Sequence, residues 1–116
     1  MNALTIDVED YYQVSAFESV VRREEWDRYE SRVERNTRKL LALLAASSVK
    51  ATFFVLGWVA ERHPGLVRAI QAEGHEIASH GYGHQVLTAL TPEQFREDIR
   101  RAKARLEDIT GHAVLG

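Results

Sequence analysis

The sequence predicts an α/β fold with parallel strands joined by crossover helices. Apolar runs of strand length alternate with helical patterns, in the order strand, helix, strand, helix, strand, helix and the start of a further strand. The run 51–56 is apolar at consecutive positions, which is typical of a strand buried on both faces of a parallel sheet. We therefore expect a parallel sheet or barrel with right-handed crossovers.

The first half of the chain contains one predicted strand and one predicted helix. Residues 3–8 alternate, are rich in β-branched side chains, and end in acidic residues. The stretch 11–29 is aromatic without a clean period, so we predict a loop with short helical turns over the mouth of a site. Ser31 and Glu34 have the spacing of a capping box, which predicts a helix over residues 32–46. The apolar face of this helix would be Val33, Thr37, Leu40, Leu41 and Leu44.

Two more strands and a helix follow. The run 51–56 is closed by Gly57 and forms the second predicted strand. Pro64 suits the first turn of a helix, which Gly74 would end. Residues 75–79 then form the third predicted strand.

The last helix has the clearest boundaries. Thr91 is a suitable N-cap, Pro92 suits the first turn, and Gln94 stands at the capping-box position. Gly111 closes the helix, and residues 113–115 begin a fourth predicted strand. The predicted core positions of this helix are Phe95, Ile99, Ala102, Leu106 and Ile109.

Composition limits the function classes. The chain has 116 residues, enough for one domain, and its 45% hydrophobic and 28% charged content is ordinary for a soluble globular protein. A net charge of −2 gives no electrostatic reason to expect nucleic acid or an anionic membrane as partner. With no cysteine, any metal site must use histidine and carboxylate. No signal peptide or membrane span is visible, so we expect no membrane insertion and cytoplasmic residence.

Acidic residues and histidines follow two of the predicted strands. Asp7, Glu9 and Asp10 lie at the end of the first strand, and His80 and His84 follow the third. In open α/β folds and barrels, ligands gather beyond the carboxyl ends of the strands. Because both groups belong to that edge, the sequence predicts one divalent-metal site there.

Three motifs give the chain a family resemblance. Residues 5–11 (TIDVEDY), 51–57 (ATFFVLG) and 74–84 (GHEIASHGYGH) resemble the polysaccharide deacetylases of the NodB-homology, carbohydrate-esterase type. The first and third motifs look closest to the subgroup associated with bacterial exopolysaccharide loci. The resemblance implies the amino-terminal portion of an irregular (β/α) barrel. The family's later motifs would lie past Gly116, so we expect one apparently truncated domain over residues 1–116.

The resemblance also implies a role for each residue. Asp7 matches the catalytic base, and His80 and His84 match two metal ligands. The third ligand is the next acid of the first motif. Strand alternation favours Glu9, which shares a face with Asp7, while Asp10 could swing in from the turn, so both remain candidates.

The resemblance implies a metal-dependent hydrolase acting on carbohydrate. The metal would be Zn²⁺, with Co²⁺ or Ni²⁺ as alternatives. The reaction would remove N-acetyl groups from a polysaccharide or a glycan that contains N-acetylhexosamine. The family's general-acid histidine belongs to the later motifs, and general acid catalysis contributes roughly 10²–10⁴ in rate. We therefore expect this chain alone to be nearly or wholly inactive.

For several other residues, both a structural and a functional role are considered. Tyr11, Tyr12, Phe17 and Trp26 would either line a sugar-binding groove or pack in the core. His75 is interpreted as a structural residue at the start of a strand, His63 as a cap and His112 as a surface residue. The charged run 22–25 is interpreted as solvated helix surface.

Two functions compete with catalysis. A receiver-type signalling domain also carries acids after its first strand, but it needs an aspartate at the end of a middle strand, and neither 51–57 nor 75–80 supplies one. A non-catalytic binding module that retains the half-barrel is the remaining alternative. Its exposed sheet edges could pair in a homo-oligomer.

Overall fold

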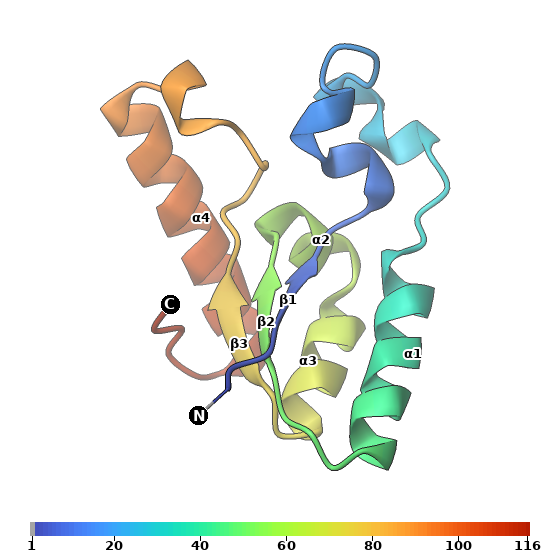
Figure 1. Ribbon diagram of the computed structural model, residues 1–116. Coiled ribbons are helices and arrows are strands. Elements are labelled where there is room, and N and C mark those ends of the chain that lie inside the picture. The colour runs from blue at the N-terminus through green and yellow to red at the C-terminus, as the bar shows by residue number, and fades with distance from the viewer. Residues whose placement is uncertain (1) are drawn as a thin grey trace.

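Three parallel strands form the centre of the molecule. The computed structural model describes residues 2–116 and contains β1 (Thr5–Val8), β2 (Thr52–Val55) and β3 (Glu76–Ser79), paired in the order β1-β2-β3 (Figure 1). Both pairs are parallel, with Asp7 opposite Phe54 and Val55 opposite Ser79. The predicted α/β fold with parallel strands is confirmed, and the carboxyl ends of all three strands lie at the same edge.

The described residues form four α-helices, which cover one face and the sides of the sheet. In Figure 1 they lie behind and beside the strands: α1 (Val33–Ala46), α2 (Gly57–Arg62), α3 (Pro64–Ala72) and α4 (Pro92–Thr110). The boundaries of α4 are confirmed by a capping box between Thr91 and Gln94 and by Gly111, which ends the helix with a φ of 69°. Helix α2 was not predicted, because six residues directly after a strand carry too short a pattern to show helical periodicity.

The start of α1 differs from the prediction. Ser31 and Glu34 do not form a capping box: the helix begins at Val33, and its N-cap, Arg32, has no side-chain cap. Instead, the Asp10 carboxylate accepts the Arg32 backbone N–H at 2.9 Å and the Ser31 hydroxyl at 2.6 Å. A side chain that is distant in the sequence therefore replaces the local cap.

The segment between β1 and α1 has the predicted character, a loop with short helical turns. It consists of three short 3₁₀ helices, η1 (Tyr11–Gln13), η2 (Ser15–Phe17) and η3 (Arg23–Arg28). A fourth, η4 (Leu87–Ala89), precedes α4. Beyond α4, the Ser79 N–H donates to the Gly116 carbonyl at 2.8 Å, so the chain returns beside β3 without forming a regular strand. No helix of the described residues is long and apolar enough to cross a membrane.

The hydrophobic core lies between the sheet and the helices. Its fully buried members include Phe53, Val55, Leu56, Leu66, Val67, Ile70 and Leu106. The prediction that Phe95 and Ile99 belong to this core was wrong, because their exposed fractions are 40% and 38%. Helix α4 extends beyond the ends of the strands (Figure 1), so only its second half, from Ala102 on, has the sheet to pack against.

Candidate metal centre

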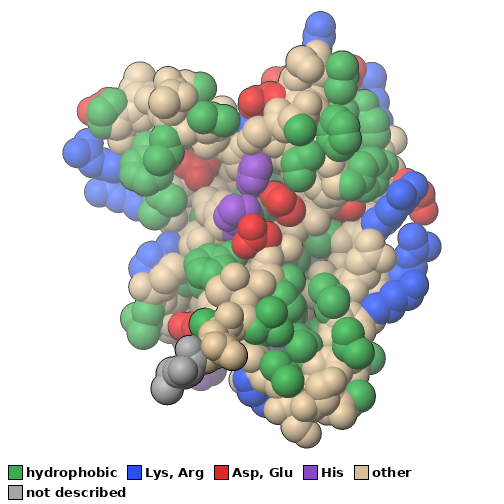
Figure 2. All heavy atoms as spheres, viewed as in Figure 1, with side chains coloured by type: hydrophobic (Ala, Val, Ile, Leu, Met, Phe, Trp, Pro, Cys, Tyr) green, Lys and Arg blue, Asp and Glu red, His purple; other side chains and the backbone are tan. Residues whose placement is uncertain are grey.

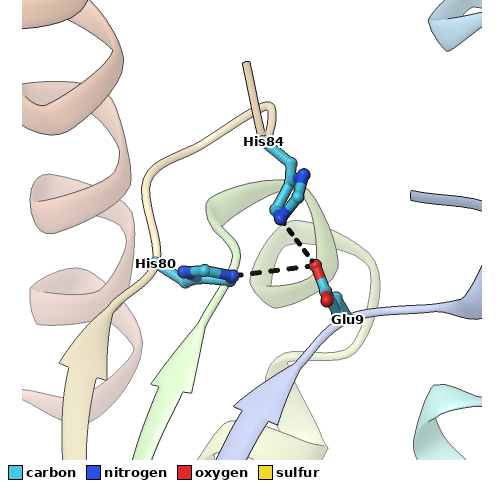
Figure 3. Close-up of side chains that lie close together, drawn as sticks. All are labelled: Glu9, His80 and His84. Atoms are coloured by element: carbon cyan, nitrogen blue, oxygen red, sulfur yellow. Dashed lines mark ion pairs between the residues drawn. The ribbon is translucent and has the colours of Figure 1, made fainter. Parts of the chain in front are cut away.

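Three side chains converge beyond the carboxyl ends of the strands (Figure 3). Glu9 follows β1, His80 follows β3, and His84 comes four residues later. Glu9 Oε2 lies 3.1 Å from His84 Nε2 and 3.6 Å from His80 Nε2. One ligand atom of each residue lies within 4.8 Å of the other two. The parallel register therefore brings together residues that are about seventy positions apart in the sequence.

The contacts within this triad are not hydrogen bonds. Glu9 Oε2 and His80 Nε2 are buried and have no hydrogen-bond partner among the described residues. Buried polar atoms are rarely left without a partner, so this arrangement requires an explanation. Donor atoms about 2.1 Å from a zinc ion at tetrahedral angles lie about 3.4 Å apart. The two Glu9 distances, 3.1 and 3.6 Å, bracket that spacing, so the triad fits a divalent cation.

Charges in the site perturb two of these groups. Contact with the His80 imidazole lowers the pKa of Glu9 despite its partial burial. In turn, contact with Glu9 raises the pKa of His80 against the opposing effect of burial, and the Asp7 carboxylate adds to the rise. Without a cation, the pair therefore favours a proton on His80 and a negative charge on Glu9.

The two other predicted acids have different surroundings. The Asp7 side chain is 56% exposed, and its Oδ2 lies 3.9 Å from His80 Nε2, beside the triad and open to solvent. Asp10 is only 2% exposed, and its carboxylate faces Ser31 and the start of α1. The structure brings Glu9, and not Asp10, to the two histidines.

Of the two interpretations of the aromatic residues, packing in the core holds for Tyr12 and Trp26. Tyr12 is 2% exposed and stacks on Tyr29 at a ring-centroid distance of 5.4 Å, with Trp26 also buried nearby. Burial and the neighbouring Asp10 carboxylate raise the pKa of Tyr12. Tyr11 and Phe17 remain exposed, and the Arg32 guanidinium lies 4.8 Å from the centre of the Tyr11 ring.

The remaining histidines lie outside the triad. His75 is buried, its Nδ1 accepts the Ala51 N–H at 3.1 Å, and burial lowers its pKa, in keeping with the predicted structural role. His63 contacts Glu34 at 3.3 Å, and His112 contacts Gln71 at 2.8 Å.

The two histidines of the triad line a cavity. Figure 2 shows histidine and acidic side chains side by side near the middle of one face, next to a hydrophobic area. The cavity beside His80 and His84 has a volume of about 500 Å³, and its apolar lining includes Leu87, Phe95 and Ile99. A ligand could therefore reach the histidines from solvent while contacting apolar side chains.

The fold and the triad define a class of protein: an α/β domain that gathers histidine and carboxylate groups where parallel strands end. The chain belongs to the polysaccharide deacetylase family, whose model matches residues 25–115.

Named relatives and solved structures agree with this membership. A peptidoglycan-N-acetylglucosamine deacetylase of Bacillus cereus is 39% identical over 77 residues, which covers 66% of this chain and 28% of that protein. A chitooligosaccharide deacetylase of Rhizobium leguminosarum bv. trifolii is 45% identical over 64 residues, covering 55% of this chain and 30% of that protein. The crystal structure of a Mycobacterium smegmatis protein described as a polysaccharide deacetylase is 30% identical, with a TM-score of 0.76, and covers 97% of this chain and 40% of that one. The chain thus spans less than a third of the length of these two curated relatives.

Proposed function

We propose that this chain carries the metal-binding part of a carbohydrate deacetylase that hydrolyses N-acetyl groups. The observation that carries the proposal is the convergence of Glu9, His80 and His84, with Asp7 beside them on the solvent side. The names of the relatives support the substrate class, because peptidoglycan N-acetylglucosamine and chitooligosaccharides are both carbohydrates. The substrate would be a polysaccharide or a glycan that contains N-acetylhexosamine.

Each residue has a distinct part in the proposal. Glu9, His80 and His84 would hold the cation, with Zn²⁺ as the expected ion and Co²⁺ or Ni²⁺ as alternatives. A divalent cation bound there would supply Lewis acidity toward the acetyl carbonyl and make water more acidic. The exposed Asp7 carboxylate has the position to accept a proton from the attacking water, as a general base.

The leaving amine also needs a proton. Of the described residues, no third histidine lies at the triad, since His63, His75 and His112 make their contacts elsewhere. General acid catalysis contributes roughly 10²–10⁴ in rate. We therefore propose that the isolated chain binds the metal but hydrolyses acetyl groups very slowly.

The metal site can be tested by a calorimetric Zn²⁺ titration. We expect one-to-one binding, and we expect the variant His80→Ala/His84→Ala to bind at least about a hundredfold more weakly, because it retains one of three ligands. The matched control is His63→Ala/His112→Ala, which removes two histidines that lie outside the triad. Equal affinities in the two double variants would refute the proposed site.

Metal affinity is expected to increase with pH. A histidine ligand must be neutral, and the pKa of His80 lies above its ordinary 6.5, so protons compete with the cation at and above that pH. We expect affinity to rise as pH increases through 6.5 and above it, with release of a proton on binding at pH 6.5. Titrations in buffers of different ionisation enthalpy would measure that proton.

The stability that His80 and Glu9 give the metal-free chain is expected to decrease above pH 6.5, where metal affinity increases, and also at low pH. The raised pKa of His80 contributes stability that is complete below 6.5 and lost as pH rises through the folded-state value. The lowered pKa of Glu9 contributes stability that is present above 4.5 and lost as pH falls through the folded-state value. The contribution of the pair is therefore largest between about pH 4.5 and 6.5. Metal affinity that does not change as pH increases through and above 6.5 would contradict the proposed ligand set.

A further inference from the structure

We propose that Asp98 of α4 and Arg23 of η3 are positioning residues that hold His84 at the metal site. Asp98 accepts hydrogen bonds from backbone N–H groups of the loop 81–84, and Arg23 donates hydrogen bonds to backbone carbonyls of the same loop. The inference rests on the proposed metal-binding function, because it concerns how one of the three ligands is held. Neither residue contacts Glu9, His80 or the His84 ring through a recorded hydrogen bond or ion pair.

The two histidines are held in different ways. The His80 N–H donates to the Val55 carbonyl at 3.1 Å, which continues the pairing of β2 with β3, so the sheet itself places His80. His84 lies at the end of an irregular loop and has a φ of 51°. This left-handed conformation is uncommon for residues other than glycine. His84 therefore depends on contacts from outside the loop to stay in place.

Asp98 holds the amide side of the loop. Its Oδ2 accepts the Tyr82 N–H at 2.8 Å, and its Oδ1 accepts the Gly83 N–H at 3.1 Å. The loop approaches the carboxylate closely, since a Cβ at Gly81 would lie 2.8 Å from Asp98 Oδ2. Gly81 also has a φ of 71°, so both the space and the backbone conformation require glycine there.

Arg23 holds the carbonyl side of the loop. Its Nε donates to the Gly83 carbonyl at 2.9 Å, and its Nη2 donates to the His84 carbonyl at 2.8 Å. A third bond, from Nη1 to Glu18 at 2.7 Å, orients the guanidinium group. This forked contact reaches the backbone of the ligand residue itself, and lysine could not reproduce it with one ammonium group.

Helix α2 completes the support through its backbone. The Gly57 N–H donates to the Gly81 carbonyl at 2.8 Å, and the Trp58 N–H donates to the Tyr82 carbonyl at 3.2 Å. The four carbonyls of residues 81–84 thus all accept hydrogen bonds, two from α2 and two from Arg23. Asp98 and Arg23 are the side chains of this arrangement that can be changed without altering the backbone of α2.

The test compares Asp98→Asn with Asp108→Asn by Zn²⁺ titration. Asparagine retains the size of the side chain but places an NH₂ donor against one of the two backbone N–H groups. We expect Asp98→Asn to weaken Zn²⁺ binding on the order of tenfold to hundredfold, as other changes behind metal ligands do. Asp108 lies exposed on the same helix and is a matched control, for which we expect unchanged affinity. Arg23→Lys is the second variant, with the exposed Arg28→Lys of η3 as its control.

A positioning role predicts coupling to His84. In a His84→Ala background, Asp98→Asn should change Zn²⁺ affinity by less than about twofold, because the residue it positions is gone. In the metal-free chain, the Tyr82 and Gly83 amides should exchange hydrogen faster in Asp98→Asn while the β3 amides are unaffected.

The outcomes separate this inference from the proposed function. Unchanged Zn²⁺ affinity in both Asp98→Asn and Arg23→Lys, or an equal loss with and without His84, would overturn the positioning role while the metal site stands. A wild-type chain that fails to bind Zn²⁺ would overturn the metal site and the positioning role with it. In that event faster exchange of the two amides would show only that the contacts stabilise the loop.

Discussion

Replacing Phe53 with alanine is expected to lower the free energy of unfolding by about 3–5 kcal/mol, the usual range for a buried phenylalanine. Phe53 lies on the central strand β2, is fully buried, and packs with its ring centroid 5.0 Å from that of His75. Its removal would leave a cavity between the sheet and the helices that the close-packed core cannot refill. Chemical denaturation followed by circular dichroism would measure the loss.

The matched control for this prediction is Phe95→Ala. Both substitutions remove the same atoms, but Phe95 is substantially exposed on the first half of α4. We expect its removal to cost less than about 1 kcal/mol, as for most surface positions. Equal costs at the two positions would mean that α4 packs more closely than the structure shows.

Replacing Asp10 with alanine is expected to cost about 3 kcal/mol in stability. The buried carboxylate accepts the Arg32 N–H and the Ser31 hydroxyl, so the variant loses two hydrogen bonds to a charged group and the cap of α1. Ser31→Ala removes one of these bonds and should cost about 1 kcal/mol. Thermal or chemical unfolding of the two variants would give both values.

The same variant distinguishes the two acids that the sequence offers as ligands. Below its unfolding transition, Asp10→Ala is expected to bind Zn²⁺ like the wild type, whereas Glu9→Ala loses a group that faces both histidines. A folded Asp10→Ala chain with no metal binding, beside a Glu9→Ala chain that still binds, would reverse the proposed assignment.

The three acids at the end of β1 have different surroundings. Asp7, within β1, faces solvent, while Glu9 and Asp10, which follow the strand, face the histidines and α1 respectively. One short segment therefore supplies the candidate base, a candidate ligand and a structural anchor. Changes at adjacent positions should consequently have separate effects on catalysis, metal affinity and stability.

Local sequence patterns were sufficient to predict most of the helices and strands. The α/β order and the parallel arrangement were predicted, because side-chain periodicity and strand-length apolar runs are properties of neighbouring residues. The limits of α4 were also predicted, since Thr91 and Gly111 act on the helix ends beside them. The edge at which Glu9 and His80 lie follows from the same order, because parallel strands end on one side.

The errors concern contacts between distant segments. Ser31 and Glu34 have a capping-box spacing, but Asp10 provides the interaction at the start of α1. Phe95 and Ile99 follow the apolar period of α4, but this half of the helix extends beyond the ends of the strands, so both side chains are exposed. In both cases the local pattern is present in the sequence. A distant part of the chain determined which side chain caps α1 and which side chains of α4 are buried.

The sequence by itself determined the class of fold, the family resemblance and the edge on which a site would lie. Only the tertiary structure decided that Glu9 rather than Asp10 faces the histidines, and that Asp98 and Arg23 hold the loop that carries His84. Strand alternation predicts the face of the strand on which a side chain lies. It does not predict how far that side chain lies from another segment of the chain. That distance depends on how α1, α4 and the sheet pack together, and for this reason Asp98 and Arg23 look in the sequence like ordinary surface charges.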